Sequence, residues 1–447
     1  MLVRRPRLRT GISKFCLSAV VDAQRGFTVR YMATWHQDAE EASRDSGNRR
    51  LSGRIHILGL GNVGTFVAHS LASRPSPPPI TLLMHTPNLY RSWLERKKCL
   101  AINTNGLDDV KTGFDVNVLN DKTWYSVPYW NKDGTAENGN DSIDGYTEDV
   151  DNEELLAQPA DERIECLIVA VKAPVTVAAM DSVKRRLTPD STVLFLQNGM
   201  GTIDELNEKV FRDPLRRPHY MSGVISHGLA RRKEPFQVSH TGVGTTILGS
   251  VPPADAVSLA NKGNVDWAPS AKYLLRTLTL TPPLVAVAET PSALMLYQLE
   301  KLAMNCVINP LTAIMNCKNG ELLYNYSFTR IMRLLLIEIS SVICALPELQ
   351  GIPGIESRFS PERLRMMIVQ LANKTAKNHS SMLQDVLARN PTEIEYLNGY
   401  IVRRGEELGI KCVVNYMMKH LVLAKRLQTK QVESGAIPID LFREPKI

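Results

Sequence analysis

The apolar and polar positions of the first half of the chain predict alternating strands and helices. The segment GRIHILGLGNVGTFVAHSLA, residues 53–72, gives a short β-branched run, a glycine turn and then a helical apolar pattern. The loop at 73–79 ends that helix, and ITLLMH at 80–85 is typical of the next strand. Two further apolar runs, at 166–173 and 192–199, are bounded by polar residues, as are strands buried on both faces of a parallel sheet. The pattern therefore predicts an α/β domain.

The second half of the chain predicts helices instead. After residues 223–249, which indicate strands joined by turns, apolar residues recur about every 3.6 positions from about residue 290 nearly to 428. The predicted helices include 328–346, 362–377, 392–409 and 412–427. A chain of 447 residues is too long for one compact core. We therefore expect an α/β domain followed by an all-helical C-terminal domain.

One predicted helix carries a line of polar side chains through an apolar sequence. In KLAMNCVINPLTAI, residues 301–314, Lys301, Asn305 and Asn309 stand four positions apart and share one helix face. Buried without partners, two amides and an ammonium are costly. A stripe that faces solvent or caps a neighbouring helix is the alternative to a ligand-binding wall. Pro310 predicts a kink there, because it leaves the carbonyl of Cys306 without its usual donor.

The first predicted turn has the glycine spacing of a dinucleotide site. The pattern G-x-G-x-x-G is formed by Gly59, Leu60, Gly61, Asn62, Val63 and Gly64. Glycines here allow a tight turn and a close approach of pyrophosphate to backbone N–H groups at a helix N-terminus. A simple tight turn between strand and helix is the alternative. The context of strand, turn and helix favours a Rossmann-like dinucleotide-binding domain.

The charges that follow this turn indicate which dinucleotide binds. NAD-binding domains usually place an acid about 20 residues on, for the ribose 2′-hydroxyl. From Gly59 through Leu94 this chain has no Asp or Glu, whereas His85, Arg91, Lys97 and Lys98 follow the second strand. Because basic groups attract a 2′-phosphate that a carboxylate would repel, NADP(H) is favoured.

Two polar residues follow predicted parallel strands at their carboxyl ends. Lys172 ends the run at 166–173, and Asn198 lies in QNGMG at 197–201. Open α/β sheets bind ligands at this edge, so both side chains are candidates for contacts with the nicotinamide end of the cofactor. An asparagine that only stabilises its own turn is the alternative for Asn198.

The net charge of +7 is concentrated at the start of the chain. Residues 1–32 hold seven Lys or Arg and one acid, Asp22, so the rest is nearly neutral. A nearly neutral folded body argues against nucleic acid binding, because such binding needs a basic patch on the folded domain. The composition of the leader is typical of a mitochondrial transit peptide, with a tail that carries no address as the alternative. A cytoplasmic protein is expected if the leader is not a transit peptide.

Other features of the composition are less specific. Residues 133–162 hold eleven Asp or Glu and no Lys or Arg, which predicts a solvated acidic insertion, with a partner-binding segment as the alternative. The seven cysteines are scattered, without C-x-x-C, so we expect reduced thiols and no metal site. No run of 18 apolar residues occurs, so no membrane span is expected.

These stretches together resemble the ketopantoate reductase (2-dehydropantoate 2-reductase) family across nearly all of residues 54–428. The resemblance rests on the glycine turn, VKAP, QNGMG, KLAMNCVINPLTAIMNCKNGEL and the stretch 378–410. It implies that Lys301 is the catalytic acid and Glu393 the second catalytic residue. It also implies substrate-binding roles for Asn305, Asn309 and Ser381, and cofactor contacts for Lys172 and Asn198. Some members of the family have an arginine where His85 aligns here, so the phosphate ligand is left open.

The resemblance implies NADPH-dependent reduction of 2-dehydropantoate (ketopantoate) to pantoate, in pantothenate and coenzyme A biosynthesis, by a eukaryotic member of fungal type. A homodimer is left open. Negative charge grows on the carbonyl oxygen during such a reduction, and Lys301 can stabilise it and donate the proton, with Glu393 holding the lysine. The expected organisation is a leader at 1–52, a Rossmann-like domain at 53–265, a helical substrate domain at 290–430 and a tail at 431–447. The alternatives are reduction of another 2-keto acid, and a non-catalytic mitochondrial regulatory protein on the same fold.

Overall fold

The structure is a computed structural model that describes residues 51–127, 158–252 and 267–434, with side chains described through residue 427. From Gly53 onward, the described residues belong to one compact unit. Nearly all of the predicted leader at 1–52, most of the acidic insertion at 133–162 and most of the tail at 431–447 lie outside the described residues. Within the described part, none of the helices has the length and apolar character that crossing a bilayer requires.

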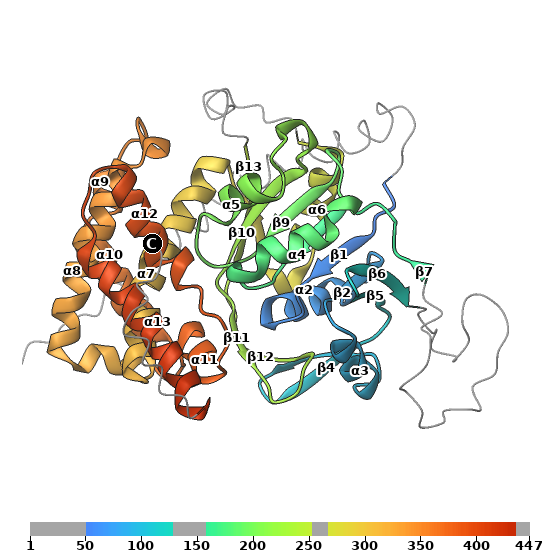
Figure 1. The fold of residues 1–447 in the computed structure, drawn as a ribbon, viewed down its shortest axis with the longest axis horizontal. Helices are drawn as coiled ribbons and strands as arrows, with labels where there is room; N and C mark the ends of the chain where they lie inside the picture. The colour runs from blue at the N-terminus through green and yellow to red at the C-terminus, as the bar shows by residue number, and fades with distance from the viewer. Residues whose placement is uncertain (1–50, 128–157, 253–266, 435–447) are drawn as a thin grey trace, which may run out of the picture. The chain divides into compact units, whose positions relative to one another are not determined.

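A largely parallel sheet forms the centre of the α/β part (Figure 1). Six neighbouring strands, in the order β10-β9-β8-β1-β2-β5, pair in parallel. They are β1 (Ile55–Leu58), β2 (Ile80–Met84), β5 (Asp115–Asn120), β8 (Cys166–Val169), β9 (Thr192–Phe195) and β10 (His219–Ile225). Strands β1, β2, β8 and β9 are buried throughout, which confirms the prediction from their continuous apolar runs.

Further strands extend both edges of this sheet within the described residues. Beyond β5 lie β6 (Thr123–Val127) and β7 (Gln158–Pro159), and beyond β10 lie β13 (Thr246–Val251) and β14 (Ala286–Ala288). The α/β part also contains α2 (Asn62–Ala72), α3 (Pro87–Glu95), α4 (Thr176–Val183), α5 (Thr202–Lys209) and α6 (Pro269–Thr279).

A second sheet has the strand order β11-β12-β3-β4. It joins β3 (Leu100–Thr104) and β4 (Leu107–Lys111) to β11 (Gly228–Arg231) and β12 (Gln237–Gly242). The hydrophobic pattern did not predict β3 to β6, because strands such as β4 are almost wholly exposed and lack an apolar run.

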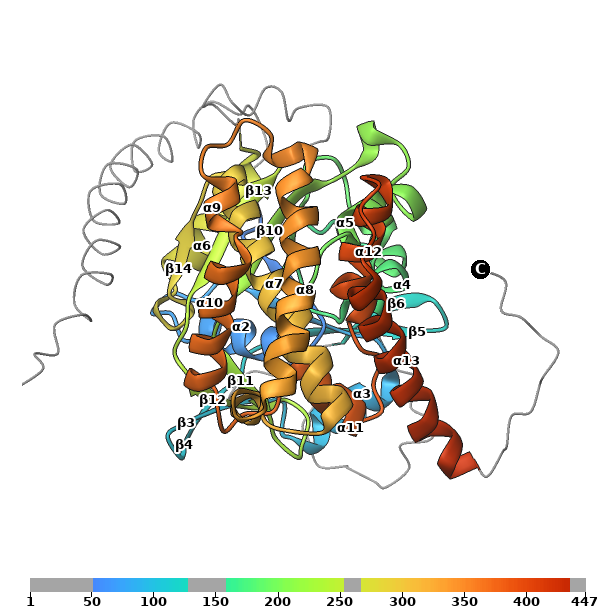
Figure 2. The ribbon, with the colours of Figure 1, turned by 90° about the vertical axis from the view of Figure 1, so that its left-hand side faces the viewer.

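The C-terminal part is helical, as predicted, and Figure 2 shows its helices in front of the sheet. The helices are α7 (Pro291–Met315), α8 (Tyr326–Ala345), α9 (Ile355–Arg358), α10 (Pro361–Lys374), α11 (Ser381–Leu387), α12 (Asn398–Glu407) and α13 (Val413–Ser434). Helix α7 contacts α8, α10, α11 and α13 within this part and also strands β10 and β13 of the large sheet. Residues of α7 can therefore face both parts of the molecule.

Pro310 lies inside α7, and the helix continues past it to Met315. The proline removes the hydrogen bond to the carbonyl of Cys306. That carbonyl instead accepts a hydrogen bond of 2.9 Å from the side-chain amide of Asn398 on α12. Asn398 is fully buried and also donates to Asn415 Oδ1. The broken backbone bond of α7 is thus replaced by a bond between two helices.

The predicted helix at 392–409 differs from the structure at its start. Residues Ile394–Tyr396 form a 3₁₀ turn, η9, and the α-helix α12 begins only at Asn398. In a continuous helix the carbonyl of Tyr396 would accept from Tyr400, but here it accepts from the N–H of Met200 in the α/β part. A contact between the two parts therefore decides where α12 begins.

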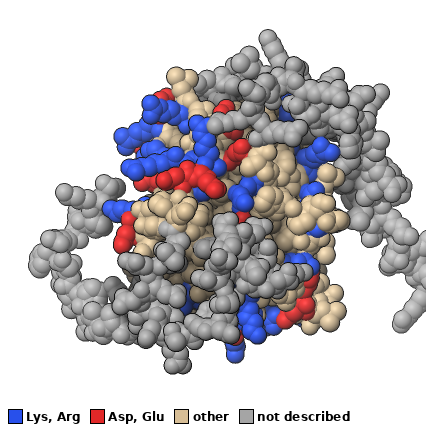
Figure 3. Space-filling model, turned by 90° about the vertical axis from the view of Figure 1, so that its right-hand side faces the viewer, with Lys and Arg blue, Asp and Glu red and all other residues tan. Residues whose placement is uncertain are grey.

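Figure 3 shows one face of the molecule on which Lys and Arg side chains gather at one edge, with Asp and Glu side chains directly beside them. The described surface includes several such ion pairs, for example Arg96 with Glu234 and Arg232 with Asp108. Neighbouring acids offset the positive charge at these places, consistent with the nearly neutral charge of the chain after its leader.

Candidate active site

The glycine turn between β1 and α2 has the shape that a pyrophosphate needs. Gly59 has φ +104°, and a Cβ there would lie 2.5 Å from the N atom of Val171. A Cβ on Gly64 would lie 1.8 Å from the Gly59 carbonyl oxygen. By contrast, no described atom lies within 4 Å of a Cβ on Gly61, the N-cap of α2. The first turn of α2 therefore offers its backbone N–H groups to open space, where an anion fits.

The side chain of Asn62, within the same turn, points to the second sheet. Its Nδ2 donates to the carbonyl oxygen of Leu229 on β11 at 3.3 Å. Leu60 and Val63 line the turn without a polar side chain, so only their backbone groups can bind phosphate. The turn thus fits a dinucleotide through its backbone.

Two of the four basic residues proposed for a 2′-phosphate lie beside the carboxyl end of β2. His85 directly follows β2, and Arg91 lies on α3, whose N-cap is Thr86; the side chains of His85 and Arg91 are exposed. The first turn of α3 contains no acid. Lys97 and Lys98 follow the opposite end of α3, so the structure does not bring them to His85. A 2′-phosphate can therefore meet His85, Arg91 and the helix N-terminus, with no carboxylate in that turn.

Lys172, Asn198 and Glu393 come together although they are far apart in the sequence. Asn198 Nδ2 donates to Glu393 Oε2 at 3.2 Å, and the N–H of Ala173 donates to Glu393 Oε1 at 3.3 Å. Lys172 Nζ lies 3.7 Å from Glu393 Oε2. The Glu393 side chain is only 5% exposed. Residues from the carboxyl ends of β8 and β9 thus bind a buried carboxylate of the helical part.

The sequence analysis missed a further member of this group, Asp385 on α11. Lys172 Nζ forms a 2.9 Å ion pair with Asp385 Oδ2, and the Asp385 side chain is 8% exposed. Burial disfavours the charged form of Lys172, but the carboxylates of Glu393 and Asp385 outweigh burial and hold the pKa of Lys172 above its ordinary value. Burial raises the pKa of Asp385, against the effect of Lys172. The position of Asp385, four residues after Ser381 on the same helix face, was the available signal. We call Lys172, Asn198, Asp385 and Glu393 the edge cluster.

Lys301 on α7 has a different environment. Its Nζ donates to the carbonyl oxygen of Ile225, at the carboxyl end of β10, at 2.6 Å. Burial lowers the pKa of Lys301 to about 8, while the negative charge of Glu393 acts in the opposite direction. The resemblance implied that Glu393 holds Lys301. In the structure the carboxylate of Glu393 instead accepts hydrogen bonds from Asn198 and Ala173.

The two asparagines on the same face of α7 have no hydrogen bond through their side chains to any residue in the described ranges 51–127, 158–252 and 267–427. Asn309 is 6% exposed and Asn305 is half-buried. Ser381, at the start of α11, is also half-buried, and the neighbouring Ser380 accepts a 2.6 Å hydrogen bond from Thr312 of α7. The start of α11 is therefore fixed against α7 near Asn309. We call Lys301, Asn305 and Asn309 the α7 line.

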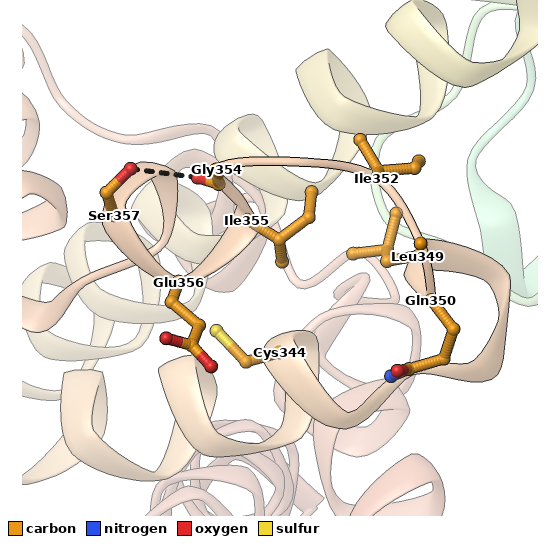
Figure 4. Close-up of a pocket in the computed structure, with 9 residues that line it drawn as sticks. Cys344, Leu349, Gln350, Ile352, Gly354, Ile355, Glu356 and Ser357 are labelled. Atoms are coloured by element: carbon orange, nitrogen blue, oxygen red, sulfur yellow. Dashed lines mark hydrogen bonds between the residues drawn. The ribbon is translucent and has the colours of Figure 1, made fainter.

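A pocket of about 370 Å³ lies elsewhere in the helical part (Figure 4). It is lined by the end of α8, the loop that follows and α9, with Cys344 and Glu356 on one side and Leu349, Ile352 and Ile355 around it. It contains none of the residues of the edge cluster or the α7 line. The chemistry described above therefore does not belong to this pocket.

Comparisons with known proteins show the family to which the chain is similar. Residues 55–253 match the family described as Ketopantoate reductase PanE/ApbA, and residues 293–426 match its C-terminal part. A 2-dehydropantoate 2-reductase of Vibrio cholerae is 36% identical over 56% of this chain and 74% of its own length. A probable 2-dehydropantoate 2-reductase of Schizosaccharomyces pombe is 28% identical over 84% of this chain and 97% of its own length. A ketoisovalerate reductase of Gibberella fujikuroi is 28% identical over 80% of this chain and 79% of its own length.

Solved structures share the fold. A PanE/ApbA family ketopantoate reductase from Ralstonia eutropha has a TM-score of 0.57 at 22% identity, over 84% of this chain and 99% of that one. A D-mandelate dehydrogenase with NADH and anilino(oxo)acetate has a TM-score of 0.56 at 18% identity, over the same shares of the two chains. On the strength of the two family matches and the relatives above 30% identity, this chain belongs to the ketopantoate reductase family of nicotinamide-dependent oxidoreductases.

Proposed function

We propose that the protein reduces 2-dehydropantoate (ketopantoate) to pantoate with NADPH, a step of pantothenate and coenzyme A biosynthesis. The observation that carries the proposal is the α7 line, where a lysine with a pKa near 8 is followed by two asparagines whose side chains have no hydrogen-bond partner in the described residues. Neither amide is fully enclosed, because Asn305 is half-buried and the polar atoms of Asn309 are not sealed off, so a ligand can reach both side chains. A keto acid with a carboxylate and a hydroxyl has the acceptors and donors that these groups lack.

The proposed chemistry assigns a role to each side of the site. When bound, NADPH supplies the hydride that adds to the carbonyl carbon. Lys301 stabilises the negative charge that grows on the carbonyl oxygen and donates a proton to that oxygen. The charge of Glu393 raises the pKa of Lys301 against the effect of burial, and so helps to keep the ammonium form at neutral pH. Asn305, Asn309 and the hydroxyl of Ser381 hold the carboxylate and hydroxyl groups of the substrate.

The preference for NADPH over NADH rests on the region after β2. The carboxylate that usually holds a ribose 2′-hydroxyl is lacking from Gly59 through Leu94, and His85 and Arg91 lie beside the N-terminus of α3 instead. Lys172 and Asn198, at the carboxyl ends of their strands, are proposed to contact the nicotinamide end of the cofactor.

A second candidate is the reduction of a different 2-keto acid by the same residues. The ketoisovalerate reductase of Gibberella fujikuroi favours this alternative, because it matches over a similar share of this chain. A non-catalytic regulatory protein on this fold is supported less well, because Lys301 and Glu393 are both present and the charge of Glu393 acts on the pKa of Lys301.

The experiment that separates these functions is NADPH oxidation by the purified protein with ketopantoate, 2-ketoisovalerate and phenylglyoxylate as substrates. We expect the highest kcat/KM with ketopantoate, and at least tenfold tighter binding of NADPH than of NADH, about 1.4 kcal/mol. A higher kcat/KM for 2-ketoisovalerate would select the second candidate. If the protein binds NADPH but oxidises it with none of the three keto acids, the result would favour the non-catalytic regulatory protein.

We also propose that residues 1–32 direct the protein to mitochondria, because they combine seven basic residues with a single acid. A fluorescent protein fused behind residues 1–32 should accumulate in mitochondria, and the same fusion with its arginines changed to alanine should not. Diffuse cytoplasmic fluorescence of the first fusion would refute the proposal.

A further inference from the structure

Tyr396, a residue without a role in the proposed chemistry, joins the helical part to the loop that carries Asn198. It lies at the end of η9 and is 9% exposed. Its carbonyl oxygen accepts from the N–H of Met200 at 2.9 Å. Its hydroxyl donates to Glu205 Oε2, on α5, at 2.7 Å. Both bonds connect η9 to the segment directly after β9.

The contact is close enough to restrict the residue beside Asn198. Gly199 has φ +85°, and a Cβ there would lie 2.4 Å from the carbonyl oxygen of Tyr396 and 2.7 Å from its Cβ. Only glycine therefore allows the loop to approach Tyr396 this closely. The backbone of the loop and that of η9 are in direct van der Waals contact.

Tyr396 also determines the position of Glu393. The N–H of Tyr396 donates to the carbonyl oxygen of Glu393 at 3.0 Å, which closes the η9 turn. Glu393 in turn accepts from Asn198 at 3.2 Å. Tyr396 is thus bonded to Glu393 itself and, through Met200, to the loop that carries Asn198. A shift of Tyr396 would change the positions of both.

The bond between Tyr396 and Glu205 is maintained over the pH range in which an enzyme works. Burial, and then the neighbouring Glu205, raise the pKa of the Tyr396 hydroxyl well above its ordinary value. The hydroxyl therefore keeps the proton that it donates. A hydroxyl that donates to a carboxylate forms one of the stronger types of side-chain hydrogen bond.

We propose that Tyr396 and Glu205 form a latch between the two parts of the molecule that positions Asn198 and Glu393 for the nicotinamide end of the cofactor. The inference rests on the proposed function, since it assigns positioning residues to the same site. Neither Tyr396 nor Glu205 contacts the reacting atoms. Both act through Asn198 and Glu393.

The test uses Tyr396→Phe, which removes only the hydroxyl, with Tyr220→Phe as a matched control. Tyr220 is also 9% exposed, and its hydroxyl donates to Asn207 Oδ1 on the same helix α5 at 3.1 Å, but within the α/β part. Each variant loses one hydroxyl hydrogen bond to α5, to a carboxylate in Tyr396→Phe and to an amide in Tyr220→Phe, so both melting temperatures should fall, that of Tyr396→Phe more. Only Tyr396→Phe should raise the Kd of NADPH, measured by fluorescence, and lower kcat/KM for the keto acid, by roughly five- to fiftyfold, because small displacements of positioning groups are costly.

Variants of the acceptor sharpen the test. Glu205→Gln keeps an oxygen that can accept from Tyr396 and should retain most of the activity, whereas Glu205→Ala should behave like Tyr396→Phe. The latch is overturned if Tyr396→Phe matches Tyr220→Phe within twofold in both NADPH binding and kcat/KM. Wild-type protein that binds NADPH but reduces no keto acid defeats the proposed substrate class alone, because the Kd of NADPH still reports on the latch. Wild-type protein that binds neither NADPH nor NADH defeats both proposals.

Discussion

The edge cluster and the α7 line are both polar groups set among buried residues, but they differ in how their hydrogen-bonding capacity is used. In the edge cluster, Lys172 pairs with Asp385, and Asn198 donates to Glu393. In the α7 line, Lys301 donates to a backbone carbonyl, and the side chains of Asn305 and Asn309 have no partner among the described residues. The edge cluster is satisfied within the protein, whereas the α7 line is not.

This difference separates residues that hold the two parts together from residues available to a substrate. A satisfied cluster that joins the two parts adds hydrogen bonds and fixes geometry. The amides of Asn305 and Asn309 are not sealed off, so a ligand can complete their hydrogen bonds without displacing a protein partner. We therefore expect substitutions in the α7 line to affect turnover more than stability, and substitutions of buried groups that the proposed chemistry does not use, such as Asn398, to do the reverse.

Replacement of Lys301 gives the largest expected effect on activity. Lys301→Ala should lower kcat by roughly 10²–10⁴, the range for loss of a general acid. NADPH binding should change little, because the glycine turn lies in the other part of the molecule. The melting temperature at neutral pH should hold or rise, since the variant no longer buries an ammonium whose pKa is lowered by burial.

A melt of the same variant across pH supplies the control. Because the pKa of Lys301 in the folded protein is about 8, below its ordinary value of 10.5, the unfolded chain binds the extra proton between these two pH values. Wild-type protein should therefore gain stability relative to Lys301→Ala as pH rises from about 8 to 10.5. A variant that melts early yet turns over normally would contradict the catalytic role.

Asn309 and Asn398 are a matched pair for a smaller effect. Both asparagines are buried, Asn309 on α7 and Asn398 on the neighbouring helix α12. The side-chain amide of Asn398 donates to the carbonyl of Cys306 and to Asn415, whereas the side chain of Asn309 has no partner among the described residues. Asn309→Ala should lower kcat/KM for the keto acid about 10- to 100-fold, the effect of losing a hydrogen bond of about 1.5–3 kcal/mol to a charged group. Its thermal melt should be unchanged or higher. An early melt with unchanged kcat/KM would show that Asn309 is structural.

Asn398→Ala should show the opposite result. Its loss leaves the Cys306 carbonyl, which Pro310 deprives of a backbone donor, without a partner. We expect the free energy of unfolding to fall by about 1–3 kcal/mol, the cost of a buried unsatisfied group, with kcat/KM of the folded protein retained. Urea denaturation measures the first quantity and initial rates the second. A loss of kcat/KM larger than that of Asn309→Ala would contradict the purely structural role of Asn398.

The sequence predicted the parts of the fold that have strong patterns. The runs at 80–85 and 166–173 were found because strands buried on both faces are continuously apolar, and α8, α10 and α13 because their apolar residues recur with helical spacing. Strand β4 was missed because it is exposed and has no apolar run. The start of α12 was misplaced because Met200, about 200 residues earlier in the chain, takes the carbonyl of Tyr396.

In the candidate site, too, features within one helix could be predicted from the sequence, and contacts between distant segments could not. The register of Lys301, Asn305 and Asn309 could be predicted, because it depends only on spacing along one helix. The ion pair of Asp385 with Lys172 could not, because it joins residues 213 positions apart through the packing of α11. For the same reason, local pattern could not reveal that Lys301 donates to Ile225 rather than meeting Glu393.

The most direct test of the account is the pH dependence of kcat/KM for the keto acid in wild-type protein and in Lys301→Ala. The lysine must be protonated to act as an acid, and burial lowers its pKa to about 8. The account predicts that kcat/KM of the wild type decreases about tenfold per pH unit above pH 8, and that this decrease is absent from the residual activity of Lys301→Ala. The same decrease in both proteins would contradict the assignment of Lys301 as the acid.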